Sequence, residues 1–164
     1  MKFNLLYILI VLSLSYSFGQ KSLGEMLETY NDETVPYVTV TELSEWNDVI
    51  LLDSREKREF DVSHIKDAIF VGFKTFDPKT ILRHHPDKNK RIVVYCSIGI
   101  RSEDIGEELI KAGYTNVYNL YGGIFEWYQQ NQPIYNSGNF PVNTIHGYQP
   151  RYGKWLTKGL KIYD

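Results

Sequence analysis

The chain has 164 residues with 18 basic and 20 acidic side chains, which give a net charge of −2 at pH 7. This mild acidity gives no reason to expect nucleic acid or an anionic membrane surface as a partner. The length suits one domain with a real core and is too short for two, and the single cysteine excludes a disulfide within the chain.

The first residues have the order of an export signal. The charged Lys2 precedes an apolar run at residues 5–12, and serines and Gly19 follow. Because a membrane helix needs about 20 apolar residues, we expect a signal peptide over residues 1–19 and a periplasmic or secreted protein. An uncleaved N-terminal anchor is the alternative. No later stretch is long and apolar enough for a second membrane segment, so no membrane association is expected after cleavage.

Composition divides the rest of the chain into three parts. Residues 20–35 form a polar lead-in, which favours a helix around residues 23–30. Residues 36–130 carry the patterns of a folded domain, and residues 131–164 mix Gly, Asn and Pro with many aromatic side chains. So many aromatic residues are unusual in a disordered segment. We therefore expect this C-terminal extension to pack on the domain.

The first half of the domain alternates strands and helices. A β-rich run at residues 37–40 precedes a short helix for which Thr41 is the expected N-cap. The apolar run at residues 49–52 is typical of a strand buried on both faces. A helix over residues 56–60 and an apolar strand at residues 68–71 are expected next.

The second half repeats this alternation. An Asp-Pro pair at residues 77–78 opens a helix, and a β-branched run at residues 91–95 leads to the cysteine. The next helix is expected to end at a left-handed Gly113, and a strand at residues 117–120 and a helix over residues 124–130 follow. Strands and helices that alternate at this interval predict an α/β domain with a mostly parallel sheet.

Cys96 stands at the end of a predicted strand, where ligands gather in parallel sheets. A thiol is nucleophilic only as the thiolate, and amides at a helix start, together with Arg101, would lower its pKa. Gly99 permits backbone angles that turn amides toward one sulfur. Glu103 and Asp104 partly oppose this effect if they face inward rather than solvent. These features alone leave a buried structural cysteine as the alternative.

Three segments together resemble the single-domain rhodaneses, a family of sulfurtransferases. Residues 96–102 resemble the family's active-site loop, in which a cysteine begins a six-residue loop with a central glycine and commonly a terminal arginine. Residues 53–68 are similar to the family's first signature and residues 118–127 to its closing signature. The resemblance covers residues 36–130 and implies a three-layer α/β domain whose mostly parallel central sheet is flanked by helices.

The first signature departs from the family pattern at two positions. Glycine usually precedes the histidine and the alanine of that signature, whereas this chain has Ser63 and Asp67 there. Both positions are expected in a turn away from the cysteine loop, so the departure concerns the geometry of the turn more than the chemistry.

The resemblance implies a reaction and a set of site residues. Cys96 would accept a sulfane sulfur from a small anionic or persulfide donor, such as thiosulfate, and form a persulfide. It would then pass this sulfur to cyanide or to a thiol of a small molecule or a protein. Arg101 would stabilise the anions, and Cys96 and Arg101 form the expected catalytic pair. Neither a metal nor an organic cofactor is implied. The substrate pocket is assigned to the other loop residues: Ser97, Ile98, Gly99, Ile100 and Ser102.

Other polar residues of the signatures are expected to have structural roles. Arg55 is expected to pair with Asp53 or Glu59 and to support the first loop. His64, in a turn, is expected to be hydrogen-bonded rather than to act as a base. The remaining histidines have no matching partners in the signatures and are expected at the surface or in the tail: His84, His85 and His146.

Loop length argues against a related phosphatase. Cysteine-dependent phosphatases, some of which share the rhodanese fold, place five residues between cysteine and arginine, whereas four separate Cys96 from Arg101. A further alternative is a persulfide carrier without significant turnover of its own. Another is an inert homologue, but the intact cysteine and arginine argue against inertness. Because the variable loop side chains Ile98 and Ile100 are uncharged, we expect a polysulfide or persulfide donor rather than thiosulfate.

Overall fold

The computed structural model describes residues 22–164, and the predicted signal peptide over residues 1–19 lies outside this part of the chain. No helix between residues 22 and 164 combines the length and the hydrophobicity that crossing a bilayer requires. The elements follow in this order: α2 (Leu23–Tyr30), β1 (Tyr37–Val38), α3 (Val40–Glu45), β2 (Val49–Asp53), α4 (Lys57–Val62), β3 (Ile69–Phe70), α5 (Pro78–His84), β4 (Arg91–Tyr95), α6 (Arg101–Lys111), β5 (Val117–Leu120), α7 (Gly123–Gln129), β6 (Ile134–Tyr135), β7 (Pro141–Val142), β8 (Thr144–His146), α8 (Pro150–Gly153) and β9 (Leu160–Ile162).

Five strands form the central sheet in the order β1-β5-β4-β2-β3. Every neighbouring pair in it is parallel, which confirms the predicted α/β domain. The central strand β4 pairs with β2 on one side and with β5 on the other. All its residues after Arg91 are buried, as expected for a strand covered on both faces. The carboxyl end of β4 therefore lies in the middle of the row of strand ends at the carboxyl side of the sheet.

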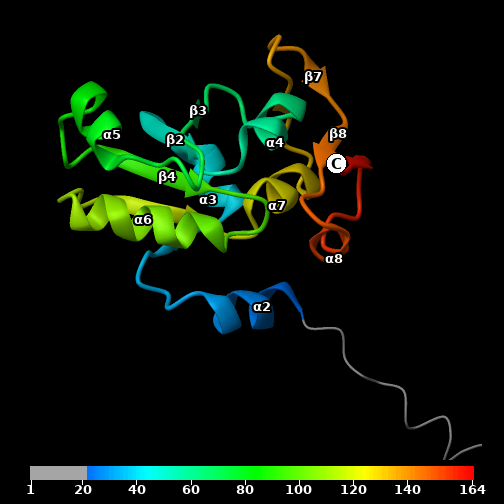
Figure 1. Cartoon of the computed structure of the whole chain (residues 1–164), viewed down its shortest axis with the longest axis horizontal. Helices are drawn as coiled ribbons and strands as arrows, with labels where there is room; N and C mark the ends of the chain where they lie inside the picture. The colour runs from blue at the N-terminus through cyan, green and yellow to red at the C-terminus, as the bar shows by residue number, and fades with distance from the viewer. Residues whose placement is uncertain (1–21) are drawn as a thin grey trace, which may run out of the picture.

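Helices cover both faces of the sheet and make three layers. Ile92 and Val94 of β4 belong to the same buried cluster as Leu109 of α6. Val93, whose side chain points to the opposite face, belongs to a second cluster with Ile124 of α7. Figure 1 shows α6 running along one side of β4, with α7 near the carboxyl end of that strand.

The structure moves the start of α3. We expected Thr41 to cap this helix, whereas Thr39 is the N-cap and Val40–Glu45 are helical. The Thr39 hydroxyl accepts a hydrogen bond from the N–H of Glu42, and the Glu42 carboxylate accepts one from the N–H of Thr39. This capping box satisfies two N–H groups at once. It therefore fixes the helix start and leaves Tyr37–Val38 for β1.

The turn between α4 and β3 accommodates both departures from the rhodanese signature. Asp67 has a φ of +60°, a left-handed conformation that aspartate adopts more readily than most residues. Ser63 has a φ of −167°, which is extended backbone open to any residue. The chain therefore keeps the turn without glycine at either position.

The C-terminal extension folds back onto the domain. An isolated β-bridge joins His64 to Tyr135, and Ile145 and Leu156 are fully buried in the cluster that contains Val93. β8 lies beside α4, and Figure 1 shows β8 and the C-terminus, coloured orange to red, at the carboxyl end of β4. The extension thus lies near the carboxyl ends of the strands, on the side of the sheet where Cys96 is found.

Candidate active site

Cys96 follows the last residue of β4, and residues 96–100 connect this strand to α6. The cysteine is 2% exposed, and its Sγ accepts a hydrogen bond of 3.2 Å from the N–H of Gly99. Gly99 has a φ of +107°, a conformation that glycine adopts at little cost. The loop therefore turns an amide toward the sulfur, as the sequence predicts.

The surroundings of Cys96 lower the pKa of its thiol below the ordinary value. Burial raises this pKa, but the positive charge of Arg101 and hydrogen bonds from the Ser102 hydroxyl and the amides of Ser102 and Gly99 together outweigh burial. Ser102 Oγ lies 3.6 Å from Sγ. The loop thus stabilises a negative charge at a site where burial by itself would suppress it.

Asn119 of β5 orients the groups beneath the sulfur. Its Nδ2 donates to the carbonyl of Gly99 at 2.8 Å and to the carboxylate of Glu103 at 3.0 Å. Its Oδ1 is therefore the acceptor for the Ser102 hydroxyl, at 2.7 Å. The Ser102 hydroxyl has one proton and its shorter contact is with Asn119, so its contact with Sγ at 3.6 Å is the weaker one. The amide of Ser102 also donates to the sulfur.

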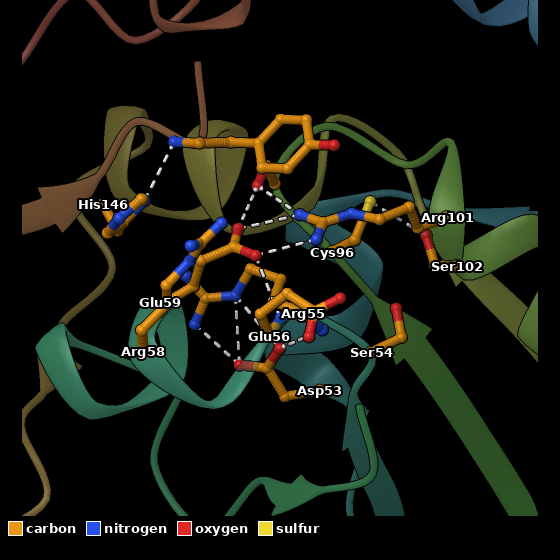
Figure 2. A network of polar contacts seen from close by, with 12 residues as sticks. Asp53, Ser54, Arg55, Glu56, Arg58, Glu59, Cys96, Arg101, Ser102 and His146 are labelled. Atoms are coloured by element: carbon orange, nitrogen blue, oxygen red, sulfur yellow. Dashed lines mark hydrogen bonds and ion pairs between the residues drawn. The ribbon is translucent and has the colours of Figure 1, made fainter. Parts of the chain in front are cut away.

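Arg101 is held by Glu59 of α4. Nη1 donates to Oε2 at 2.7 Å and Nη2 to Oε1 at 2.8 Å, and Nη2 also donates to the Ser97 hydroxyl at 3.0 Å. Burial raises the pKa of Glu59, but the hydrogen bonds and charge of Arg101, with the charge of Arg55, lower it to about 2. Figure 2 shows the Arg101 side chain extending past Cys96 toward this carboxylate.

Arg55 pairs with Asp53, one of its two expected partners. Both side chains are fully buried, and Arg55 Nη2 lies 2.6 Å from Asp53 Oδ2. The same nitrogen donates to the carbonyl of Ser63 at 2.6 Å, so Arg55 ties the end of β2 to the end of α4. The other expected partner, Glu59, binds Arg101 instead. In Figure 2 the pair of Arg101 and Glu59 is drawn above the pair of Arg55 and Asp53.

The polar lead-in packs against the cysteine loop at Gly99. Nδ2 of Asn31 donates to the carbonyl of Gly99 at 2.8 Å and to the hydroxyl of Tyr37 at 2.7 Å. Leu27 of α2 is buried and lies under Gly99, where an added Cβ would be 3.4 Å from the Leu27 side chain. Sequence reasoning missed Asn31, because nothing in a polar segment indicates a contact 68 residues along the chain.

The two acids at the start of α6 face in different directions. Asp104 is exposed, whereas Glu103 is 2% exposed. The Glu103 carboxylate accepts hydrogen bonds from the N–H of Thr34 at 2.9 Å and from Asn119 at 3.0 Å. The inward acid is thus hydrogen-bonded to the lead-in and β5, where it anchors both to α6.

A chamber of about 170 Å³ adjoins the cysteine. Its walls come from the loop and from the C-terminal extension: Cys96, Ser97, Ile98, Ile100, Arg101, Tyr148 and Tyr152. Three predicted substrate residues therefore line it, whereas Gly99 and Ser102 contact the sulfur directly. Sequence reasoning missed Tyr148 and Tyr152, for which the aromatic content of the extension was the available signal.

His146 lies in the C-terminal extension, as expected, but it is not at the surface. His146 is buried, its Nε2 lies 3.1 Å from Oδ1 of Asp164, and its Nδ1 accepts a hydrogen bond of 3.1 Å from the N–H of Tyr148. β8 pairs with β9 near the C-terminus, a pairing that the sequence pattern does not reveal. The ring of His64 stacks on Phe60 at 4.0 Å, and its Nδ1 lies 3.1 Å from the carbonyl oxygen of Phe60.

Fold and site together define a class of protein. The protein is an α/β domain in which a buried cysteine, at the carboxyl end of the central parallel strand, begins the loop that leads into a helix. A loop amide and a guanidinium then lower the pKa of the thiol.

The family model of the rhodanese-like domain matches residues 38–130. The match covers more than half of the chain, and the protein therefore belongs to the rhodanese-like domain family. The resemblance seen in the three sequence segments is confirmed.

Curated relatives share this part of the chain. The tRNA uridine(34) hydroxylase of Hamiltonella defensa subsp. Acyrthosiphon pisum (strain 5AT) is 36% identical over 107 residues, which are 61% of this chain and 30% of that protein. The protein of the same name from Aster yellows witches'-broom phytoplasma (strain AYWB) is 37% identical over 83 residues, 49% of this chain and 27% of that protein. The chain thus spans less than a third of the length of these relatives.

Solved structures agree on the fold. The thiosulfate sulfurtransferase from Pseudomonas aeruginosa superposes with a TM-score of 0.58 at 24% identity, over 69% of this chain and 22% of that chain. At this identity, the likeness shows a shared fold.

Proposed function

We propose that the protein is a sulfurtransferase that carries a sulfane sulfur on Cys96. The observation that supports this function best is the environment of the buried thiol: its Sγ accepts a hydrogen bond from the N–H of Gly99 at 3.2 Å, and the charge of Arg101 lowers its pKa despite burial. A structural cysteine needs no such stabilisation of negative charge, whereas a nucleophilic one does. Membership of the rhodanese-like family supports the same reading.

The reaction needs two transfers of one sulfur atom. The Cys96 thiolate attacks the outer sulfur of a donor R–S–SH, the S–S bond of the donor breaks, R–S⁻ leaves and Cys96–S–SH forms. An acceptor thiolate R′–S⁻ then attacks that outer sulfur, becomes R′–S–SH and regenerates the Cys96 thiolate. Charge balances in each step and nothing is oxidised overall. The protein therefore has to stabilise an anionic sulfur throughout, which the loop amides and Arg101 are placed to do.

The donor is a polysulfide or persulfide rather than thiosulfate. Both Nη atoms of Arg101 are already bonded to Glu59, so one arginine charge, which the Glu59 carboxylate partly offsets, would face the two negative charges of thiosulfate. The side chains of Ile98 and Ile100 add no positive charge. A singly charged or neutral sulfur chain fits such a site better, because less charge must be transferred out of water.

The acceptor is an external thiol, of a small molecule or a protein. Cys96 is the single cysteine of the chain, so no second thiol of the same chain can attack its persulfide. With the predicted signal over residues 1–19, this exchange takes place outside the cytoplasm, in the periplasm or after secretion.

Steady-state kinetics with glutathione persulfide and with thiosulfate test the enzyme and its donor together. We expect kcat/KM at least tenfold higher with glutathione persulfide; equal or greater efficiency with thiosulfate would contradict the donor assignment. Sulfur that loads on the protein with negligible turnover would identify the alternative, a persulfide carrier. The Cys96→Ser variant is nearly isosteric and should remain folded without transferring sulfur. Transfer by that variant would contradict the role of Cys96.

The names of the curated relatives give a second candidate, a role in hydroxylation of tRNA. The identity of 36% over 107 residues favours it, but the net charge of −2 gives the chain no general attraction for nucleic acid. An electrophoretic mobility assay with total tRNA separates the two. Salt-sensitive binding at micromolar protein would favour the tRNA role, and sulfur transfer without such binding would exclude it.

A further inference from the structure

The C-terminal extension places an aromatic side chain directly against the cysteine loop. Tyr148 has a φ of +61°, an uncommon conformation for a bulky side chain that persists only where its surroundings hold it. Its N–H donates to Nδ1 of His146, and His146 is in turn held by Asp164, which also pairs with Arg58 of α4 at 2.7 Å. The turn at Tyr148 is therefore fastened to the domain.

Tyr148 and Tyr152 close one side of the cysteine chamber. The guanidinium carbon of Arg101 lies 4.3 Å from the centre of the Tyr148 ring, and the Tyr148 and Tyr152 rings are 5.5 Å apart. Both tyrosines line the chamber together with Cys96. Because residues 131–164 lie outside the family match, this wall is supplied by a part of the chain that the rhodanese-like domain does not include.

The chamber is too small for the whole of an organic persulfide such as glutathione persulfide. Pockets for complete small ligands have volumes of about 300–1,000 Å³, whereas the chamber at Cys96 has about 170 Å³. A neighbouring groove of about 800 Å³ shares Arg101 and Tyr148 with the chamber. A small molecule with its sulfur at Cys96 would therefore have its remaining atoms in the groove, and Arg101 and Tyr148 would lie between the two spaces.

The walls of the groove carry charges of both signs, and one of their cations stands outside the ion pairs of residues 22–164. They include Lys57, Arg58, Lys74 and Arg101 together with two acids, Glu56 and Asp164. Lys57 pairs with Asp61 and Arg58 with Asp164, whereas no ion pair of Lys74 is found among the described residues. Lys74 thus offers a cation to a carboxylate that enters the groove.

We propose that Tyr148 and Tyr152 form a selective entrance to Cys96. The entrance admits the narrow sulfur chain of a low-molecular-weight, carboxylate-bearing persulfide such as glutathione persulfide, whose body lies in the groove beside Lys74. It excludes the persulfides and thiols of folded proteins, so of the two classes of acceptor it leaves the small thiol. This inference rests on the proposed function for the identity of the transferred group, but the geometry of the entrance is testable without sulfur transfer.

Two thiol reagents of different size test the entrance directly. Methyl methanethiosulfonate is small; the Cys96 thiolate displaces methanesulfinate from it and forms a methyl disulfide. A maleimide attached to a polyethylene glycol chain is bulky, and the thiolate adds to its double bond with uptake of a proton from water. The measured quantity is the rate of Cys96 labelling by the small reagent divided by the rate with the bulky reagent. We expect this ratio to be large in the wild type and to fall at least tenfold in Tyr148→Asn. Asparagine removes the ring and tolerates a left-handed φ. Tyr152→Ala should lower the ratio as well.

A matched control lies on the same extension. Phe140 is 69% exposed and does not line the chamber, so Phe140→Ala should leave the rate ratio unchanged. Circular dichroism checks that each variant is folded. An unchanged ratio in both folded tyrosine variants, or wild-type protein that reacts equally well with both reagents, would overturn the entrance.

The groove has its own test in the full-length protein. Lys74→Gln should raise KM for glutathione persulfide severalfold with little change in kcat, and should leave the rate with uncharged methyl methanethiosulfonate unchanged. An unchanged KM would overturn the assignment of the groove to an anionic body. Size-selective labelling without any transfer of sulfur to Cys96 would instead overturn the proposed function and leave the entrance intact.

Discussion

At the scale of single residues, Arg101 acts on Cys96 through its charge rather than through a hydrogen bond. Its Nη atoms donate to Glu59 and Ser97, yet the charge of Arg101 is the largest influence that lowers the pKa of Cys96. The ion pair fixes the position of the guanidinium, and the low exposure of the site keeps its field unscreened. Glu59 is thus a positioning residue for Arg101.

Removing the charge of Arg101 should raise the pKa of Cys96. Burial would then be opposed by the hydrogen bonds of Ser102 and Gly99 without the arginine charge. We expect Arg101→Gln to slow alkylation of Cys96 by iodoacetamide severalfold at neutral pH, and to shift the pH dependence of that rate upward. Lys111→Gln, at an exposed position of the same helix, is the control. A pH profile identical to that of the wild type would show that Arg101 does not stabilise the thiolate.

The pKa of Glu59 predicts a loss of stability in acid. Because its pKa of about 2 in the folded protein lies below its ordinary value of 4.5, the ionised carboxylate stabilises the fold above pH 4.5, and this contribution is lost as the pH falls toward 2. The shift corresponds to roughly 3 kcal/mol.

Urea unfolding measured across this pH range checks the prediction. Glu59→Gln should be less stable than the wild type at neutral pH, since it leaves Arg101 without its partner, and should lose less stability between pH 4.5 and 2. Glu28→Gln at an exposed position should follow the wild-type curve. Equal pH dependence in Glu59→Gln and the wild type would contradict the account.

At the scale of elements, the start of α7 limits how the cysteine loop can sit. Gly123 has a φ of +55°, and a Cβ there would lie 2.4 Å from the carbonyl oxygen of Cys96 and 2.7 Å from the carbonyl carbon of Ser97. Both contacts are with backbone, which a small rotamer change cannot relieve. The close approach also allows the N–H of Ile124 to donate to the Cys96 carbonyl at 2.9 Å.

Gly123→Ala should therefore disturb the loop itself. We expect a loss of about 2 kcal/mol or more in the free energy of unfolding and slower alkylation of Cys96, because the backbone of the loop must move. Gly24→Ala in α2 is the matched control, since a Cβ there meets its nearest atom at 3.5 Å and alanine favours a helix. Wild-type stability and reactivity in Gly123→Ala would show that the loop is not held by α7.

The elements were predictable where local chemistry decides them. The Asp-Pro start of α5, the apolar run of β4 and the glycine after α6 are found where the sequence places them, and Gly113 has a φ of +97°. Thr41 was a wrong choice because Thr39 satisfies the same N-cap pattern with Glu42 three residues later. Periodicity does not distinguish two threonines that lie so close together.

The site was predictable only where its residues are neighbours in the sequence. Cys96 and Arg101 are joined by one loop, so their spacing indicates their contact. The partners that complete the site come from far along the chain: Glu59 lies 42 residues before Arg101, and Asn31 lies 68 residues before Gly99. Such contacts depend on how the layers pack, which sequence patterns do not specify.

At the scale of the whole molecule, both ends outside the family match take part in the site. The lead-in holds the loop from below through Asn31, and the C-terminal extension covers it through Tyr148. Ile145 and Leu156 are buried in a cluster shared with β4, so the extension belongs to the core of the domain. The access to Cys96 in this rhodanese-like domain is therefore restricted by segments of the same chain that lie outside the family match.

Intact-protein mass spectrometry after incubation with glutathione persulfide tests the central claim, that Cys96 carries a sulfane sulfur. We predict that the wild-type protein gains the mass of one sulfur atom, that peptide mapping locates it on Cys96, and that a thiol acceptor removes it. The Cys96→Ser variant should gain nothing. A wild-type protein that gains no sulfur, or a Cys96→Ser variant that gains as much, would contradict the account.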